Sequence, residues 1–133
     1  MNKYSFLRIS ERTKECIEQD NIIYSINFKD NTATILESKS EKEEIIIPRT
    51  ITFESIEFVI KCIRKFAFHK SKAKSIQFAA DSEILTIESD AFHISQIESF
   101  SIPASLVDIQ EGWCERTPNL TKINVSPDNP RYK

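Results

Sequence analysis

A pattern of apolar and polar positions recurs three times in the second half of the chain. Residues 73–78 (AKSIQF), 97–102 (IESFSI) and 120–125 (LTKINV) have apolar side chains at positions one, four and six and polar side chains at positions three and five. Successive copies start 24 and 23 residues apart. Neighbouring side chains of a strand point to opposite faces, so positions four and six turn inward together. The pattern predicts short strands that stack once per coil of a solenoid.

A second pattern lies between these strands and keeps the same period. Residues 63–71 (IRKFAFHKS) and 87–95 (IESDAFHIS) share an isoleucine, an Ala-Phe pair and a histidine at a spacing of 24 residues. Residues 109–114 (IQEGWC) form a degenerate third copy, in which Trp113-Cys114 replaces the Ala-Phe pair. The strand pattern and this second pattern recur with the same period. We therefore interpret the whole second half of the chain as a repeat.

Stacking of the copies predicts the core. One column comprises Ile76, Phe100 and Ile123, and a second comprises Phe78, Ile102 and Val125. Burial of each such side chain stabilises the fold by about 1.5–3 kcal/mol before conformational entropy is counted. Phe68, Phe92 and Trp113 are expected to fill the same core from the opposite wall. A coil cannot bury its apolar face alone, so about three coils are needed, and the chain has about three.

The repeated motifs resemble the BspA-like leucine-rich repeat family of surface antigens. The resemblance rests on the two Ile-x-x-x-Ala-Phe blocks, on Ile102-Pro103-Ala104-Ser105-Leu106 and on Gln110-Glu111-Gly112-Trp113-Cys114. It covers about residues 45–125 and, more faintly, residues 22–36. It implies a right-handed coil of short parallel strands, a role in adhesion or ligand binding without catalysis, and a location at the cell surface. No signal peptide is visible in residues 1–20, so the sequence itself leaves the compartment unknown.

The first half of the chain predicts a β-rich cap. Residues 22–28 alternate between apolar and polar side chains, and residues 32–36 form the returning strand of a hairpin. Residues 51–53 and 58–60 predict a second hairpin. Residues 10–19, in contrast, predict a short helix capped by Ser10.

The boundary between cap and solenoid is placed after residue 47. The polar residues 37–44 predict a loop, and Ile45-Ile46-Ile47 predicts a buried strand that Pro48 ends. We therefore expect a mainly β fold: a short right-handed leucine-rich-repeat solenoid of about three coils (residues 48–133) with an N-terminal β-hairpin cap (residues 1–47). The residues after Val125 are expected to be too few to cover much of the last coil.

Composition excludes several classes of function. Eighteen basic and twenty acidic side chains leave a net charge of −2, which provides no basic stripe for nucleic acid. The single glycine, Gly112, cannot build a dinucleotide- or phosphate-binding loop, and we expect it to adopt a left-handed conformation. Three widely spaced cysteines indicate neither a disulfide framework nor a zinc ribbon. No cofactor is expected, and no apolar run is long enough to insert into a membrane.

Reactive side chains have structural explanations in the repeat. His69 and His93 occupy equivalent positions and should stack in adjacent coils, but a metal site needs three or four ligands, so no metal is expected. Cys114 aligns with Phe92, which favours a buried hydrophobic role over a nucleophile. We expect Trp113 to fill the core and not to bind a ligand. The acidic residues Asp81, Glu83, Glu88 and Asp90 are expected to form a solvated face. No catalytic residue is predicted.

The outward side chains of the repeated strands form the candidate binding site. They are Ser75, Gln77, Ser99, Ser101, Lys122 and Asn124. Together they predict a small, polar, nearly flat surface of the kind that repeat proteins use to bind other proteins. A merely solvated strand exterior is the alternative interpretation of these positions.

The sequence thus predicts a non-catalytic module for protein binding or adhesion, whose partner is a protein such as a host or matrix protein. The alternative is a structural unit that assembles into dimers or filaments through open solenoid ends. Asn119 and Asn124 begin N-x-S/T sequences, and whether they are glycosylated is left open. The identity of the ligand, the oligomeric state and whether the chain is a fragment are also left open.

Overall fold

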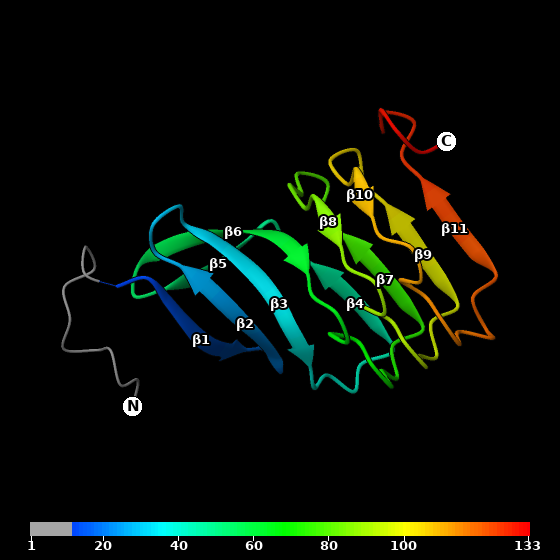
Figure 1. Ribbon diagram of the computed structural model, residues 1–133, viewed down its shortest axis with the longest axis horizontal. Coiled ribbons are helices and arrows are strands. Elements are labelled where there is room, and N and C mark those ends of the chain that lie inside the picture. Colours follow the sequence, from blue (N-terminus) through cyan, green and yellow to red (C-terminus); the bar gives the residue numbers. More distant parts are fainter. Residues whose placement is uncertain (1–11) are drawn as a thin grey trace.

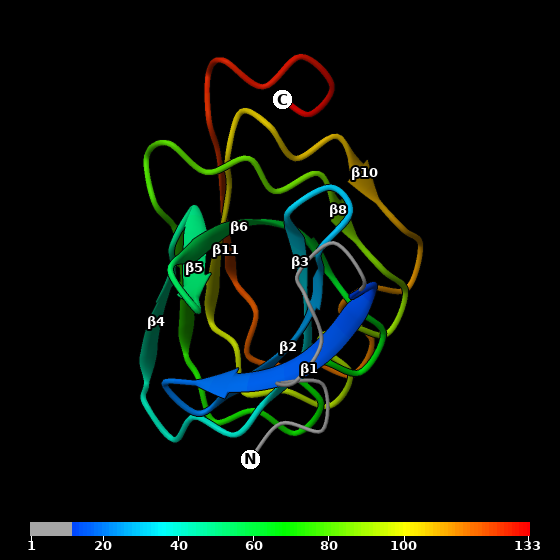
Figure 2. The same ribbon diagram turned by 90° about the vertical axis from the view of Figure 1, so that its left-hand side faces the viewer.

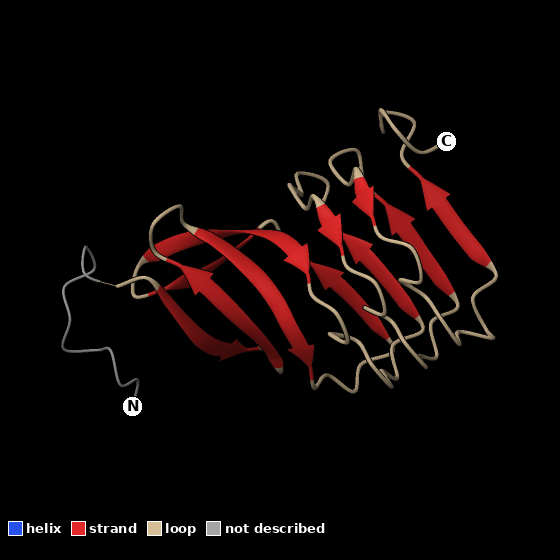
Figure 3. Cartoon of the chain, in the orientation of Figure 1, coloured by secondary structure: helices blue, strands red, loops and turns tan. Residues whose placement is uncertain are grey.

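Strands are the only regular elements that the computed structural model describes, and it describes residues 12–133 (Figure 3). In chain order these strands are β1 (Lys14–Gln19), β2 (Ile22–Asn27), β3 (Thr32–Ser38), β4 (Glu44–Ile47), β5 (Thr50–Phe53), β6 (Ile56–Ile63), β7 (Ser75–Phe78), β8 (Thr86–Ile87), β9 (Ser99–Ile102), β10 (Asp108–Ile109) and β11 (Lys122–Val125). The predicted mainly β fold is therefore confirmed.

The strands form two sheets that face each other as the walls of a solenoid (Figure 1). The first sheet has the order β1-β2-β3-β6-β8-β10, with β5 paired to β6, and the second has the order β11-β9-β7-β4. Each coil contributes one strand to each wall, so that β3 with β4, β6 with β7, β8 with β9 and β10 with β11 make about four turns. The additional turn arises because β4 is a strand of the solenoid sheet, although it lies before the predicted boundary at residue 47.

The first predicted core column is in register. Ile76 pairs with Phe100, and Phe100 pairs with Ile123, in a parallel ladder. Ile76 and Phe100 are 1% and 0% exposed, but Ile123 is 48% exposed. The prediction that Ile123 is buried is wrong because β11 is the edge strand, and no described coil stacks on it.

Aromatic rings fill the space between the two walls. The rings of Phe68 and Phe92 stack with centroids 4.8 Å apart, and Phe92 contacts Phe100 edge-on at 5.5 Å. Trp113 lies 4.9 Å from Phe100 and packs against the core, as predicted. In this coil the large residue comes first, as Trp113-Cys114. In the two earlier coils the small residue comes first, as Ala67-Phe68 and Ala91-Phe92.

A left-handed residue recurs in the turn of each coil. Gly112 has a φ of 79°, which confirms the predicted left-handed conformation. The equivalent residues of the two earlier coils, Phe66 and Asp90, adopt the same conformation with φ values of 63° and 60°. Backbone hydrogen bonds link these positions: the Phe66 N–H donates to Asp90 at 3.1 Å, and the Asp90 N–H donates to Gly112 at 3.0 Å. The repeat therefore imposes this conformation on residues other than glycine.

The cap is made of antiparallel hairpins, as predicted for β2–β3 and β5–β6. The predicted helix over residues 10–19 is wrong for the described part, because β1 pairs with β2. Residues 10 and 11 lie outside the described residues. The apolar alternation of β1 is hidden in the sequence because a charged residue takes an inward position: Glu15 is 4% exposed and lies 3.6 Å from the buried Arg12.

Within β4, the burial alternates and is not continuous. Ile45 and Ile47 are buried, whereas Ile46 is 66% exposed on the solvent face of the second sheet. The prediction of a wholly buried strand fails because only one face of this sheet meets the core. β4 ends immediately before Pro48, as expected.

The C-terminal tail closes part of the last coil, contrary to the expectation that it would cover little. Asn129 is 1% exposed, and its side-chain amide donates to the carbonyl oxygens of Pro103 at 2.8 Å and Leu106 at 2.9 Å. The Tyr132 hydroxyl accepts a hydrogen bond from the Ile109 N–H at 3.0 Å. The tail thus covers the β10 side of the coil, while β11 stays open.

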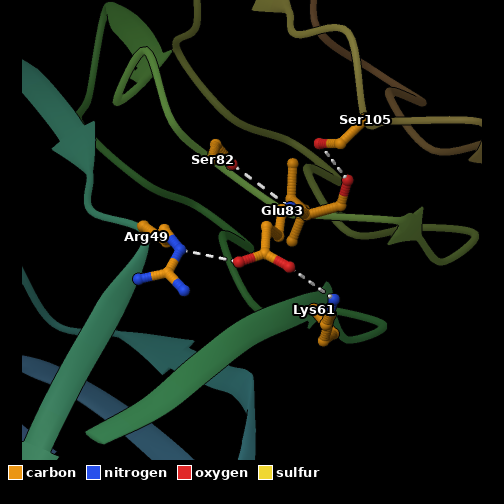
Figure 4. Close-up of polar contacts among 6 residues, drawn as sticks. Arg49, Lys61, Ser82, Glu83 and Ser105 are labelled. Atoms are coloured by element: carbon orange, nitrogen blue, oxygen red, sulfur yellow. Dashed lines mark hydrogen bonds and ion pairs between the residues drawn. The ribbon is translucent and has the colours of Figure 1, made fainter.

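An ion-pair cluster joins the cap hairpin to the next coil (Figure 4). Glu83 contacts Arg49 at 2.6 Å and Lys61 at 3.3 Å. The sequence predicted only a solvated side chain at this position, whereas the structure shows that it forms two ion pairs. From the corresponding loop of the next coil, between β9 and β10, the Ser105 hydroxyl donates to the carbonyl oxygen of Ile84 at 2.6 Å. Hydrogen bonds from Arg49 and Lys61 lower the pKa of Glu83 below its ordinary value.

We expect Glu83→Gln to destabilise the protein at pH 7 and to have less effect in acid. A carboxylate with a lowered pKa contributes stability above its unfolded pKa of about 4.3, and this contribution is lost as the pH falls through the folded value. The measurement is the urea midpoint of both proteins at pH 7 and near pH 3. Glu111→Gln, at an exposed carboxylate, is the control. An equal difference between Glu83→Gln and wild type at both pH values would contradict the prediction.

Candidate binding surface

The six predicted binding residues lie on the solvent face of the second sheet. The parallel register aligns Ser75, Ser99 and Lys122 in one row across β7, β9 and β11. The second row follows two residues later on each strand and comprises Gln77, Ser101 and Asn124, of which Asn124 pairs with Ser101. We name these six residues the sheet face. The structure therefore brings all six together on three neighbouring strands of one sheet.

The middle of the sheet face is lined by small side chains. Ser75, Ser99 and Ser101 are half-buried, since neighbouring strands flank them, while Lys122 and Asn124 are exposed on the edge strand β11. A serine projects little beyond the backbone, so a partner can approach the sheet closely. The surface is thus low in its centre and higher at its β11 edge.

Two residues extend the sheet face and were missed from the sequence. Glu44 pairs with Ser75, and Ile46 pairs with Gln77, so that β4 adds a fourth position to each row. The sequence does indicate that β4 is a repeat strand, because Ile45 and Ile47 match the apolar positions four and six of the repeat. This indication was hidden because Ile45 precedes its partner Ile76 by 31 residues, which exceeds the 24-residue period.

Two hollows adjoin the sheet face, one at each end of its strands. The hollow at the strand starts has a volume of about 780 Å³ and is lined by Lys42, Glu43, Glu44, Lys74, Ser75, Gln77, Glu98 and Ser99. The hollow at the strand ends has a volume of about 450 Å³, and Phe78, Ile102 and Pro103 give it an apolar floor. Each hollow shares residues with the sheet face. The surface therefore offers polar contacts at one end and apolar contacts at the other.

Charged side chains around the polar hollow form weak, solvent-exposed pairs. Lys74 lies 3.4 Å from Glu43, and Lys72 lies 3.5 Å from Glu41. Exposed ion pairs of this kind contribute about 0–1 kcal/mol, and salt screens them. These charges can therefore exchange partners at little cost.

The two histidines lie in the turns between the sheets and not on the sheet face. Their imidazoles stack with centroids 5.4 Å apart, as their equivalent repeat positions predicted. The ring of Phe66 contacts His69 at 5.5 Å and His93 at 5.9 Å. Over residues 12–133, no group of three or more His, Cys, Asp or Glu side chains could hold a metal ion. The pair is thus part of an aromatic stack between adjacent coils.

Cys62 and Cys114 show no feature of an activated nucleophile. Burial raises the pKa of Cys62 to about 11, with Glu88 and Asp108 adding to the effect, and burial also raises the pKa of Cys114. A thiol with a raised pKa stays protonated near neutral pH, and the thiolate is the nucleophilic form. Cys114 is half-buried, so it is less enclosed than its repeat equivalent Phe92.

Both N-x-S/T asparagines are exposed. Asn124 belongs to the sheet face itself, whereas Asn119 precedes β11 in the turn. A glycan on Asn124 would cover the β11 edge of the sheet face, while one on Asn119 would leave its centre open.

The coils, the in-register columns and the aligned outward rows define a leucine-rich repeat solenoid. The model of the BspA type leucine rich repeat region matches residues 13–131 with 6 copies. The chain belongs to this family. The resemblance predicted from the Ala-Phe and Ile-Pro motifs is thus confirmed.

Solved structures share the fold at low sequence identity. The pneumococcal vaccine antigen PcpA is 22% identical over 90% of this chain, with a TM-score of 0.60. A leucine rich cell surface protein from Faecalibacterium prausnitzii is 20% identical over 86% of this chain, also with a TM-score of 0.60. A leucine-rich repeat protein from Bacteroides capillosus is 16% identical over 84% of this chain, with a TM-score of 0.58.

The relatives differ from this chain in length. The chain spans 40% of the pneumococcal antigen and 32% of the Faecalibacterium protein, but 98% of the Bacteroides protein. No curated protein matches the sequence. Among residues 12–133, there is no helix of the length and apolar character needed to cross a membrane.

Proposed function

We propose that the protein is a non-catalytic module of a surface protein and that it binds a protein partner through the sheet face. The observation that carries this proposal is the alignment of the six outward side chains in two rows, with serines at the centre and a hollow at each end. Repeat proteins commonly bind through such extended surfaces.

Two further observations support the proposal. The Faecalibacterium relative is a cell surface protein and the pneumococcal relative a vaccine antigen, which favours a surface location for this protein. Within the described residues, the raised pKa values of Cys62 and Cys114 do not favour nucleophilic catalysis.

We expect the double substitution Ser99→Arg with Ser101→Arg to weaken partner binding at least tenfold, which corresponds to about 1.4 kcal/mol. Two long cations at the centre of the sheet face would prevent close approach of a partner. Surface plasmon resonance against a panel of purified matrix and serum proteins measures the effect, and thermal unfolding verifies the fold.

The matched control for this experiment lies on the opposite wall. Thr34 and Thr86 both pair with Cys62 in the first sheet, so Thr34→Arg with Thr86→Arg places the same charges on the other face. We expect the control to bind as the wild type does. Equal binding by all three proteins would remove the sheet face as the binding site.

A second candidate function is self-assembly through the open end of the solenoid. It is favoured by one observation: Ile123 is 48% exposed, although its column partners are buried. An edge strand with an apolar face can pair with a second copy and form dimers or filaments.

We expect Ile123→Asp to abolish self-association if the end assembles, because it buries a charge in the new interface. Light scattering over a wide range of protein concentration measures the mass. Leu85→Asp, at an exposed leucine between β7 and β8 and away from both edge strands, is the control. A wild-type protein that stays monomeric at high concentration would contradict the assembly.

A further inference from the structure

A pocket of about 290 Å³ lies at the opposite end of the solenoid, beside β4. Its apolar lining comes from Ile22 of β2, Ile51 of β5 and Pro48. Its rim includes Asp20, in the turn between β1 and β2, and Lys42. Figure 2 shows the end of the molecule at which β1, β4 and β5 come together. The pocket contains none of the six residues of the sheet face, although it borders their extension on β4 through Glu44 and Ile46.

The free edge of β4 forms one side of this pocket. β4 pairs with β7 and with no other described strand. The carbonyl oxygens of Glu43 and Ile47 accept hydrogen bonds from the β7 side, and successive residues of a strand point their backbone groups to alternate edges. The N–H and C=O groups of Glu44 and Ile46 therefore face away from β7. These groups can receive one further strand.

The hydroxyl of Tyr24 is available to a ligand in the pocket. Tyr24 of β2 lines the pocket, and no hydrogen bond joins its hydroxyl to a side chain or backbone group of residues 12–133. The hydroxyl is not among the buried polar atoms without a partner, so it keeps contact with solvent and can accept a hydrogen bond from a ligand. Burial and the charge of Asp20 raise the pKa of Tyr24 to about 12, which keeps the hydroxyl neutral.

The charges at the pocket select the chemistry of a ligand. Asp20 and Glu44 carry negative charges, and Lys42 carries the single positive charge of the lining. Asp20 and Tyr24 both line the pocket, so a ligand seated in it meets both oxygen groups. A cation suits this pair because a phenol and a carboxylate oxygen both accept from an ammonium group.

We propose that this pocket binds an extended peptide of another protein, which adds as a strand to the free edge of β4 and inserts one basic side chain. The peptide backbone bonds to the free groups of Glu44 and Ile46. Its alternate side chains point inward, and the aliphatic part of one of them packs on Ile22 and Ile51. The charged end of that side chain lies between the Tyr24 hydroxyl and the Asp20 carboxylate. Strand addition of this kind combines main-chain affinity with side-chain specificity.

The test uses a fluorescein-labelled peptide of alternating valine and threonine with one central lysine, and anisotropy measures its binding to the full chain. We expect saturable binding by the wild type. Replacement of the lysine by norleucine should weaken binding at least tenfold, because the charged contact is lost. Tyr24→Phe should weaken it about three- to tenfold, as expected for one hydrogen bond. Asp20→Asn should weaken it by a similar factor and retains a residue that tolerates the left-handed turn.

Two further measurements locate the peptide. A peptide N-methylated on alternate amides, along the edge that would face β4, should not bind, and the backbone amide signals of Glu44 and Ile46 should shift in NMR spectra when the parent peptide binds. The Ser99→Arg/Ser101→Arg protein should bind it normally, which separates this site from the sheet face. Equal affinity for the lysine and norleucine peptides, wild-type affinity in both Tyr24→Phe and Asp20→Asn, shifts confined to β11, or no saturation at millimolar peptide would each overturn the proposal.

Discussion

Phe92→Ala is expected to destabilise the protein by about 3–5 kcal/mol, which is a large part of the 5–15 kcal/mol typical of a domain. Phe92 is 1% exposed and contacts the rings of Phe68, Phe100 and Trp113. Its removal leaves a cavity that both walls border, and the coils on either side cannot close it without breaking their ladders. Urea unfolding followed by the fluorescence of Trp113, the single tryptophan, measures the loss.

The matched control for this core substitution is Phe66→Ala. Phe66 lies one coil earlier, is 45% exposed and contacts the two histidine rings at the surface. We expect it to cost less than about 1 kcal/mol, because little apolar area leaves the interior. Similar losses for the two variants would show that the ring stack does not hold the coils together.

Asn129→Ala is expected to cost about 2–6 kcal/mol, because four hydrogen bonds of about 0.5–1.5 kcal/mol each are lost. The side-chain amide donates to the carbonyl oxygens of Pro103 and Leu106, and its oxygen accepts from the backbone N–H groups of Arg131 at 2.9 Å and Tyr132 at 2.7 Å. The substitution releases the tail from the last coil. Hydrogen exchange at the Ile109 amide, which donates to the Tyr132 hydroxyl, should then become faster.

Two variants test whether these hydrogen bonds are the cause. Asn129→Leu restores apolar volume but leaves the carbonyl oxygens of Pro103 and Leu106 without their donor, so it should remain destabilised. Asn119→Ala, at an exposed asparagine, should stay within about 0.5 kcal/mol of the wild type. If Asn129→Leu were as stable as the wild type, burial would explain the role of this residue, and the hydrogen bonds would not.

The sequence predicted the repeated part of the fold well because its physical cause is local and periodic. Strands alternate their side chains, so Ile76 and Phe100 could be assigned to one column from spacing alone, and the model of the protein family confirms the repeat. The same alternation predicted the outward direction of Ser75 and Ser99. Periodicity could not reveal Glu44 and Ile46, because the chain between β4 and β7 holds an additional hairpin and departs from the period.

The sequence by itself determined the solenoid, its inward columns, its hairpins and the polar character of its outward rows, because each follows from alternation within a few residues. Only the tertiary structure decided what happens at the ends. Burial depends on whether a further coil is present, so Ile123 is exposed although Ile76 is buried. The same holds for Asn129, whose side-chain amide is buried because it donates to the carbonyl oxygens of Pro103 and Leu106 in a segment distant in the chain.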